Sequence, residues 1–207
     1  MTNQTAFTLI NKQTGNLAFK LFSFEDNSYF DHLQRNNYYS LIWIMEGKGK
    51  LKTDFSEYNF GANSLFSFTP YQPFMFLSNL IRGIAIYFHS DFFCIHKHQK
   101  EVTCNGVLFN NIYQVPFIRV DDDLANTFNS LIDQIISEMQ HPGLAQYEML
   151  ISLMKIFLIS AARLKNRPSL AIAKYNLGAA RIVVLVVPSV VNKINSDMNN
   201  APPLPRR

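Results

Sequence analysis

The sequence has few cysteines, few charged residues and no long apolar run. It contains 2 cysteines, Cys94 and Cys104, in 207 residues, and without signs of export they are expected to be free thiols rather than a disulfide. No apolar stretch approaches the roughly 20 residues that a membrane-spanning helix needs. Residues 1–15 lack the basic start and apolar segment of a secretion signal. We therefore expect a cytoplasmic protein without a membrane anchor.

Excess positive charge is missing from most of the chain and gathers at its end. The formal net charge is +4, yet residues 1–165 sum to −1 and residues 166–207 to +5. The larger part therefore lacks the basic surface typical of nucleic-acid binding. Aromatic residues show the same break, because only Tyr175 of the 18 Phe, 9 Tyr and 1 Trp follows residue 165. We place a boundary near residue 166.

Apolar and aromatic residues are plentiful before that boundary, and they first follow a strand pattern. Hydrophobic residues make up 48% of the chain, enough to bury a core. Gly47, Gly49, Pro70 and Pro73 separate short runs rich in β-branched and aromatic residues, which predicts a β barrel or sandwich. The predicted strands are 17–24, 38–46, 49–55, 64–70, 73–78 and 81–88.

The apolar period changes to that of a helix over residues 121–165. Asp121 or Asp122 is a suitable N-cap for a first helix, and His141-Pro142-Gly143 ends it. A second amphipathic helix then reaches residue 165. The two helices are expected to form an antiparallel pair that covers the barrel, contacts a second subunit, or does both. The predicted fold class is mainly β with C-terminal α.

Three motifs in this order resemble the N-terminal sensory half of AraC-type transcription regulators. They are the Glu46-Gly-Lys-Gly49 turn, the spaced Gly61-to-Pro73 stretch with Phe66 and Pro70, and the sequence YFHSDFF at 87–93. The resemblance covers about residues 5–165. It implies a cupin-like (jelly-roll) β barrel over 1–120, a helical dimerisation hairpin over 121–165, and an effector held inside the barrel.

Regulators of this family normally continue into a DNA-binding domain with two helix-turn-helix units. Residues 166–207 do not resemble one, because 182–191 is rich in β-branched residues around Pro188 and 199–207 has turn and polyproline composition. We interpret 166–207 as an aberrant or poorly ordered tail and hypothesise that the DNA-binding domain is missing, so that specific DNA binding by this chain alone is not expected. The apolar run could be an exposed strand or pack weakly on the rest of the chain. The coding DNA sequence would test the hypothesis: another reading frame beyond residue 165 that encodes helix-turn-helix units would support it.

Metal-dependent catalysis has little support in the sequence. Catalytic cupins hold a metal through a His-x-His pair and a Glu on one strand and a further His on a later one, but 38–46 and 73–78 contain no histidine. One cluster has residue types that bind zinc: Cys94, His96, His98, Glu101 and Cys104. The alternative is that this segment is a solvated basic loop. The run Asp121–Asp123 is explained by a helix start.

No nucleophile motif or phosphate-binding glycine loop is present either. We therefore predict no catalytic residue, no metal ligand and no cofactor. The alternative that stays open is a cupin-type small-molecule-binding protein or a metal-dependent enzyme with an atypical site.

Alternation along the strands gives candidate ligand-binding residues. If Glu46 points into the barrel, the other even-numbered residues of its strand do so too. The candidate set is Ser40, Ile42, Ile44, Glu46, Phe74, Phe76 and Tyr87. These groups suit a small apolar or aromatic effector, but they would equally suit an interior filled by its own side chains. Trp43 lies on the opposite strand face, where we expect it to pack under a helix.

A wide apolar stripe on the helical pair predicts a dimer interface. The chain is expected to form a homodimer or mixed dimers with intact relatives, and the alternative is a helical pair packed only on its own barrel. The predicted interface residues are Leu131, Ile135, Leu150, Leu153, Met154 and Phe157.

Overall fold

The computed structural model describes residues 6–53, 56–78, 80–93, 108–109 and 115–166, and the backbone of 171–177 and 180–186. The chain divides into two compact units, Met1–Lys165 and Asn166–Arg207. The first unit contains most of the strands and both helices, and the second contains a β-hairpin.

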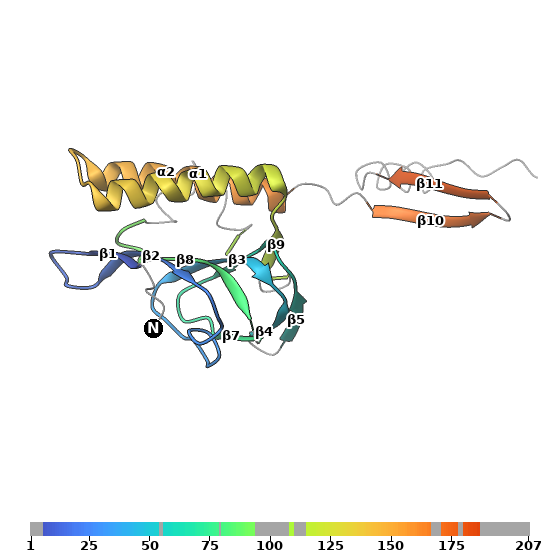
Figure 1. Ribbon diagram of the computed structural model, residues 1–207, viewed down its shortest axis with the longest axis horizontal. Helices are drawn as coiled ribbons and strands as arrows, with labels where there is room; N and C mark the ends of the chain where they lie inside the picture. Colours follow the sequence, from blue (N-terminus) through green and yellow to red (C-terminus); the bar gives the residue numbers. More distant parts are fainter. Residues whose placement is uncertain are drawn as a thin grey trace, which may run out of the picture. The chain divides into compact units, whose positions relative to one another are not determined.

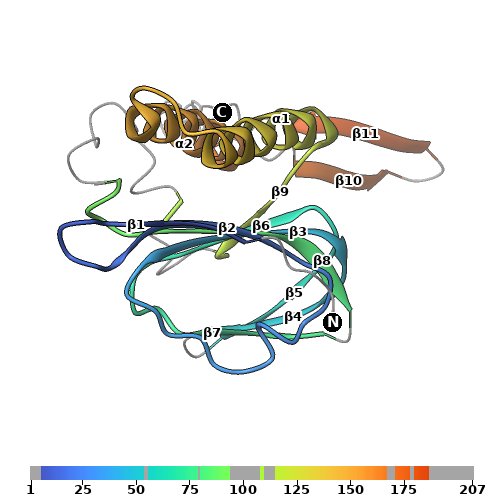
Figure 2. The same cartoon turned by 60° about the vertical axis from the view of Figure 1, so that its left-hand side comes forward.

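Two antiparallel sheets form the β part of the first unit (Figure 1). The six-stranded sheet has the order β1-β2-β8-β3-β6-β9 and the three-stranded sheet the order β5-β4-β7. Figure 2 shows the two sheets facing each other, with both helices on the outer side of the larger one. The strands are β1 (Ala6–Ile10), β2 (Leu17–Phe24), β3 (Tyr39–Gly47), β4 (Gly49–Thr53), β5 (Ser56–Phe60), β6 (Ser64–Phe68), β7 (Phe74–Leu77), β8 (Ile81–Phe88) and β9 (Phe117–Arg119).

The turn in the motif EGKG carries the chain from one sheet to the other. Gly47 has a φ of +104°, a conformation that costs glycine little and other residues much. A Cβ atom at Gly49 would lie 2.6 Å from the backbone oxygen of Leu77. Both glycines are therefore required by the backbone, one for its dihedral angle and one for a close approach.

The connection between β2 and β3 closes the barrel along β7. The backbone N–H of Phe76 donates to the carbonyl of Phe30 at 3.0 Å, and Gln34 and Phe74 exchange two backbone hydrogen bonds. The side-chain amide of Asn27 donates to the Phe76 carbonyl at 2.8 Å. Phe30 itself is completely buried, so this connection fills part of the interior as well as its side.

The six-stranded sheet carries a separate apolar core on each face. On β3, Ile42 and Ile44 belong to the core inside the barrel, whereas Leu41 and Trp43 belong to the core under the helices. This is the alternation expected of a strand that is buried on both sides. Trp43 packs edge-on against Phe128 of the first helix with ring centroids 5.6 Å apart, which confirms the prediction made for it.

The helices are α1 (Asp122–Gln140) and α2 (Gln146–Lys165). Asp121 caps α1 by accepting a hydrogen bond from the backbone N–H of Leu124 at 2.9 Å, so this aspartate has the structural role predicted for it. The chain leaves the helix at His141, just before Pro142. The rings of Phe128 and Phe157 stack at 4.0 Å and join the two helices to each other.

The predicted dimer-interface residues are buried within one chain. All six are at most 5% exposed and lie in the core between the helices and the sheet: Leu131, Ile135, Leu150, Leu153, Met154 and Phe157. Assigning them to a surface between subunits was therefore wrong, because the apolar stripe is covered by the chain's own barrel and by the neighbouring helix. Whether two chains associate stays a prediction.

In the second unit the structure describes two antiparallel strands, β10 (Ala171–Leu177) and β11 (Ala180–Val186). A two-stranded hairpin alone is only marginally stable in water. The described part of this unit contains no helix.

No helix among the described residues is long and apolar enough to cross a membrane.

The predicted fold class, mainly β with two helices at the C-terminal side of the barrel, is confirmed by these strand pairings and helices. The six predicted strands all occur with small differences at their ends. Strands β1, β5 and β9 of the first unit were not predicted.

Candidate functional site

The strand register arranges the interior side chains of the larger sheet in rows. Lys20 on β2 pairs with Tyr87 on β8, and Tyr87 pairs with Ser40 on β3. Directly opposed residues of neighbouring strands have Cβ atoms about 5 Å apart. A lysine, a tyrosine and a serine therefore lie side by side at one end of the barrel, where the row continues to Phe68 on β6.

The following rows are mostly apolar. The next row consists of Phe22, Ala85, Ile42 and Phe66, and the row after it contains Phe24, Gly83 and Ile44. Aromatic rings from the facing sheet pack against these rows, as Phe76 does edge-on against Phe66 with centroids 4.9 Å apart. The third row also contains a serine, Ser64 opposite Ile44, whose hydroxyl donates to the Gly61 carbonyl at 2.8 Å. The first row brings a lysine, a tyrosine and a serine together, and we name it the Lys20–Tyr87–Ser40 row.

Tyr87 is the most unusual member of this row. Its side chain is 0% exposed, and its hydroxyl has no hydrogen-bond partner among the described residues. The ring stacks on Tyr38 with centroids 4.6 Å apart and meets Phe22 edge-on at 5.3 Å. A buried hydroxyl without a partner costs free energy, so a bound molecule that accepted its hydrogen bond would recover that cost.

The phenols of Tyr87 and Tyr38 stay protonated well above neutral pH. Burial, followed by the neighbouring phenols of Tyr29 and Tyr38, raises the pKa of Tyr87. The Tyr29 side chain also contributes to the raised pKa of Tyr87 through its hydroxyl, as the smallest of the causes. Burial, followed by Tyr29, raises the pKa of Tyr38 to about 12. Both Tyr87 and Tyr38 therefore remain hydrogen-bond donors at neutral pH.

The raised pKa values link stability to pH. The unfolded chain releases its phenol protons near pH 10, whereas the folded chain retains those of Tyr87 and Tyr38 to higher pH. The contribution of these two groups to stability is therefore fully present below about pH 10 and is lost as the pH rises above it.

Lys20 brings a positive charge to the same place. Its ammonium lies over the ring of Phe22, 4.8 Å from the centroid, and 5.6 Å from the centroid of Tyr29. In the described part of the chain, no carboxylate lies within ion-pair distance of this ammonium. The Lys20 side chain is half-buried, so the aromatic faces stabilise a charge that water reaches only in part.

Six of the seven predicted ligand-binding residues lie inside the barrel as expected. Five belong to the interior core, Ile42, Ile44, Phe74, Phe76 and Tyr87, and Ser40 is buried beside Tyr87. Whether they contact a ligand stays a prediction.

The inward orientation predicted for Glu46 is wrong. A bulge between Ile44 and Glu46 adds a residue to β3, which reverses the faces that strict alternation would give. The Glu46 side chain is 69% exposed and lies 3.7 Å from Arg82.

Sequence reasoning missed three residues of the site, Lys20, Tyr29 and Tyr38. A signal existed for Lys20, because alternation along 17–24 places it on the same face as Phe22 and Phe24. The same signal existed for Tyr38, because it begins the predicted strand 38–46 on its even-numbered face. Tyr29 lies in the connection between β2 and β3, where no periodic pattern applies.

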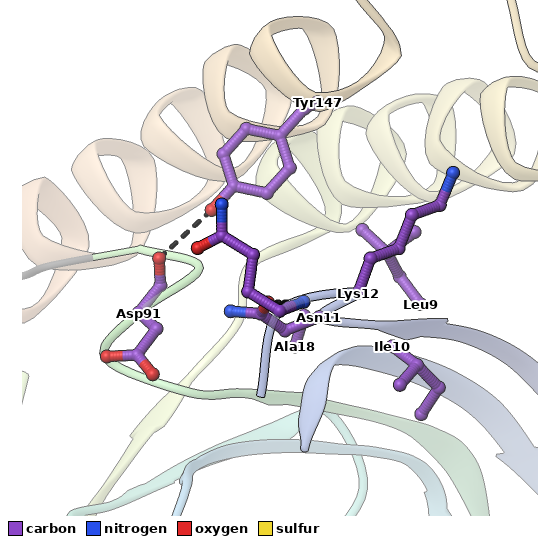
Figure 3. Close-up of a pocket in the computed structure, with 8 residues that line it drawn as sticks. Leu9, Ile10, Asn11, Lys12, Ala18, Asp91 and Tyr147 are labelled. Carbon is purple, nitrogen blue, oxygen red and sulfur yellow. Dashed lines mark hydrogen bonds between the residues drawn. The ribbon is translucent and has the colours of Figure 1, made fainter. Parts of the chain in front are cut away.

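A pocket of about 390 Å³ lies outside the barrel (Figure 3). It is formed by the β1–β2 hairpin, the turn after β8 and the start of α2, and its lining includes Leu9, Lys12, Asp91 and Tyr147. The Tyr147 hydroxyl lies 3.0 Å from the backbone oxygens of Asp91 and Phe92. The Asp91 carboxylate lies 3.2 Å from the imidazole of His89. These polar groups already have partners within the chain, so they connect α2 to the turn after β8 and do not need a ligand to satisfy them.

The described residues contain no group of three or more His, Cys, Asp or Glu side chains that could hold a metal ion. The zinc alternative fell on Cys94, His96, His98, Glu101 and Cys104, which lie outside the described residues.

No protein-family model and no curated protein sequence matches the chain. Among solved structures, the AraC-like transcriptional activator CuxR is similar at 8% identity and a TM-score of 0.43, covering 88% of this chain. The chain spans 58% of the length of that activator.

Cupin proteins are also among the similar structures. A cupin 2 conserved barrel domain protein from Salinispora arenicola is 14% identical, with 49% of this chain and 87% of that one covered and a TM-score of 0.32. A salicylate 1,2-dioxygenase from Pseudaminobacter salicylatoxidans is 10% identical, with 42% and 26% covered and a TM-score of 0.30. These similarities establish neither a family nor an activity for the chain.

Proposed function

We propose that this chain is an effector-sensing and dimerisation module of the AraC type, and that a small molecule binds at the Lys20–Tyr87–Ser40 row. The observation that supports the proposal best is the Tyr87 hydroxyl, which is buried without a hydrogen-bond partner among the described residues. The proposal includes no catalytic role and no metal. It also assigns no DNA-reading role to the described residues.

The position of the row supports binding at the end of the barrel rather than at its centre. Towards the other end of β2, β8 and β3, aromatic and aliphatic groups fill the interior. Tyr38, Tyr29 and Lys20 are only partly buried, so solvent reaches this end of the barrel. Polar groups at the mouth of an apolar barrel are the arrangement that orients a small ligand.

Replacing Tyr87 with phenylalanine tests the proposal. Because the substitution removes an unsatisfied hydroxyl and keeps the ring, we expect Tyr87→Phe to raise the free energy of unfolding of the ligand-free protein by about 1 kcal/mol or more. It should also weaken the thermal stabilisation that a binding small molecule produces. Urea unfolding and thermal-shift screening on the full chain would measure the two effects.

Tyr71→Phe is the matched control, since Tyr71 is 62% exposed and should change neither quantity. A further signature is the loss of stability above about pH 10, which should be less steep in Tyr87→Phe than in the original protein. If Tyr87→Phe were destabilised and ligand stabilisation were unchanged, the hydroxyl would have a structural partner and the proposed site would be wrong.

The dimer remains part of the proposal, but it requires a different surface from the buried apolar stripe. On α2, Met149 and Ile156 are 50% and 49% exposed and are separated by seven residues, so they share one outer face of the helix. We expect light scattering on the purified chain to give the mass of a dimer and Ile156→Asp to reduce it to that of a monomer. Asp133→Asn, on the exposed face of α1, is the control, and a monomer at micromolar concentration in the unsubstituted chain would contradict the proposal.

A further inference from the structure

We infer that the ligand of the Lys20–Tyr87–Ser40 row is a planar aromatic molecule with a single carboxylate. This inference rests on the proposed function, because it names the chemical class bound at the same site. It follows from the charge at the row, from the hydroxyl donor beside it, and from the rings that surround both.

The charge argues for an anion. The Lys20 ammonium is half-buried and has no carboxylate partner among the described residues. Aromatic faces stabilise it only in part, because a cation–π contact is weaker than a close pair of opposite charges. A ligand carboxylate would neutralise this charge in surroundings where water is partly excluded and Coulomb attraction is correspondingly stronger.

The neighbouring groups argue for a carboxylate. Tyr87 keeps its proton at neutral pH because burial raises its pKa, so it can donate a hydrogen bond to a negatively charged oxygen. Such charge-assisted hydrogen bonds are about twice as strong as neutral ones. The second oxygen would lie toward Lys20 or Ser40, which flank Tyr87 on the two adjacent strands. With one cationic side chain in the row, a singly charged anion matches the site better than a doubly charged phosphate.

The surrounding rings argue for a flat apolar body. Tyr38 stacks on Tyr87 with an interplanar angle of 30°, and Phe22 and Tyr29 meet with centroids 4.8 Å apart. Phe68, the last member of the row, stacks on Phe74 at 4.0 Å. Rings at these spacings interact favourably in stacked and edge-on arrangements, so an aromatic ligand would extend contacts that the protein already makes.

Tyr38 packs over the ring of Tyr87, with centroids 4.6 Å apart. The Tyr38 side chain is partly exposed, whereas the Tyr87 side chain beneath it is not exposed at all. Rotation of Tyr38 away from Tyr87 would therefore uncover the buried hydroxyl and a ring face of the same shape as the ligand. In this arrangement the aromatic ring of the ligand takes the place of the Tyr38 ring.

Three pairs of probes test the inference: benzoate with benzamide, 4-hydroxybenzoate with 4-hydroxybenzamide, and phenylacetate with phenylacetamide. Each pair keeps the ring and removes the charge. Thermal shift and calorimetry on the full chain should show at least one carboxylate binding, and its amide binding at least tenfold more weakly. Lys20→Met should abolish this preference, while Lys20→Arg, which keeps the charge, should preserve it. Lys52→Met, at an exposed position of β4, is the control.

The outcomes separate the inference from the proposed function. If an amide bound as tightly as its carboxylate and Lys20→Met changed nothing, while Tyr87→Phe still weakened binding, the ligand class would be wrong and the proposed site would stand. If no probe bound at millimolar concentration, the ligand class would again be wrong. If, in addition, Tyr87→Phe failed to stabilise the ligand-free protein, the site itself would be refuted.

Discussion

Gly83→Ala is expected to prevent the barrel from closing. A Cβ atom at Gly83 would lie 2.0 Å from the backbone oxygen of Trp43 and 2.9 Å from the ring of Phe24. The ring could move, but the carbonyl belongs to the paired strand β3, so relief of this contact would separate β3 from β8. Overpacking together with lost hydrogen bonds in the sheet should cost about 3–5 kcal/mol, a large part of the stability of an ordinary domain. We expect the variant to be insoluble or to unfold at a much lower urea concentration.

Gly61→Ala is the matched control for this substitution. A Cβ atom at Gly61 would have no neighbour within 4 Å, so the same added methyl group should change the free energy of unfolding by less than about 1 kcal/mol. If Gly83→Ala unfolded at the same urea concentration as Gly61→Ala, the close pairing of β3 and β8 would be incorrect.

Phe128→Ala is expected to release the helical pair from the barrel. Phe128 is 0% exposed, stacks on Phe157 of α2 at 4.0 Å and meets Trp43 of β3 at 5.6 Å. One ring thus connects both helices to the sheet. Truncation of a fully buried phenylalanine typically costs about 3–5 kcal/mol, and here it would also remove two aromatic contacts.

The chain carries its own reporter for this experiment. Trp43 is the 1 tryptophan of the sequence, so its fluorescence reports directly on the interface that Phe128 fills. Phe128→Ala should shift the Trp43 emission to longer wavelength and move the urea midpoint down, whereas Leu144→Ala, at a fully exposed position between the two helices, should do neither. An unchanged emission spectrum in Phe128→Ala would mean that the helices do not pack on the sheet through this ring.

Much of the fold could be predicted because the two faces of each strand have different neighbours. The opposite placement of Trp43 and Ile42 follows from alternation alone, and so does the inward set on β8. Alternation failed at Glu46, because a single added residue reverses the faces and leaves no mark on the composition of the strand.

The prediction of the dimer-interface residues failed for another reason. An apolar stripe on a helix shows that something covers it, but it does not distinguish another subunit from the chain's own sheet. Both surfaces bury the same kinds of side chain, and the sequence contains no further information that separates them.

The candidate site was predicted in part. Tyr87 and Ser40 follow from the pattern of their strands, but the lone charge beside them was overlooked since lysines on strands usually face solvent. The missing hydrogen bond of Tyr87 depends on which groups the folded chain brings near it, and that depends on distant strands and on the connection between β2 and β3.

The larger sheet is a single layer that separates two apolar cores. Tyr87 belongs to the interior, while Ile86 and Phe88, its immediate neighbours on β8, belong to the compartment beneath the helices. Only the strands of the larger sheet separate the two compartments. We expect a ligand at the proposed site that displaced β8 to act directly on the side chains beneath α1 and α2, because Tyr87 and its neighbours Ile86 and Phe88 belong to one strand.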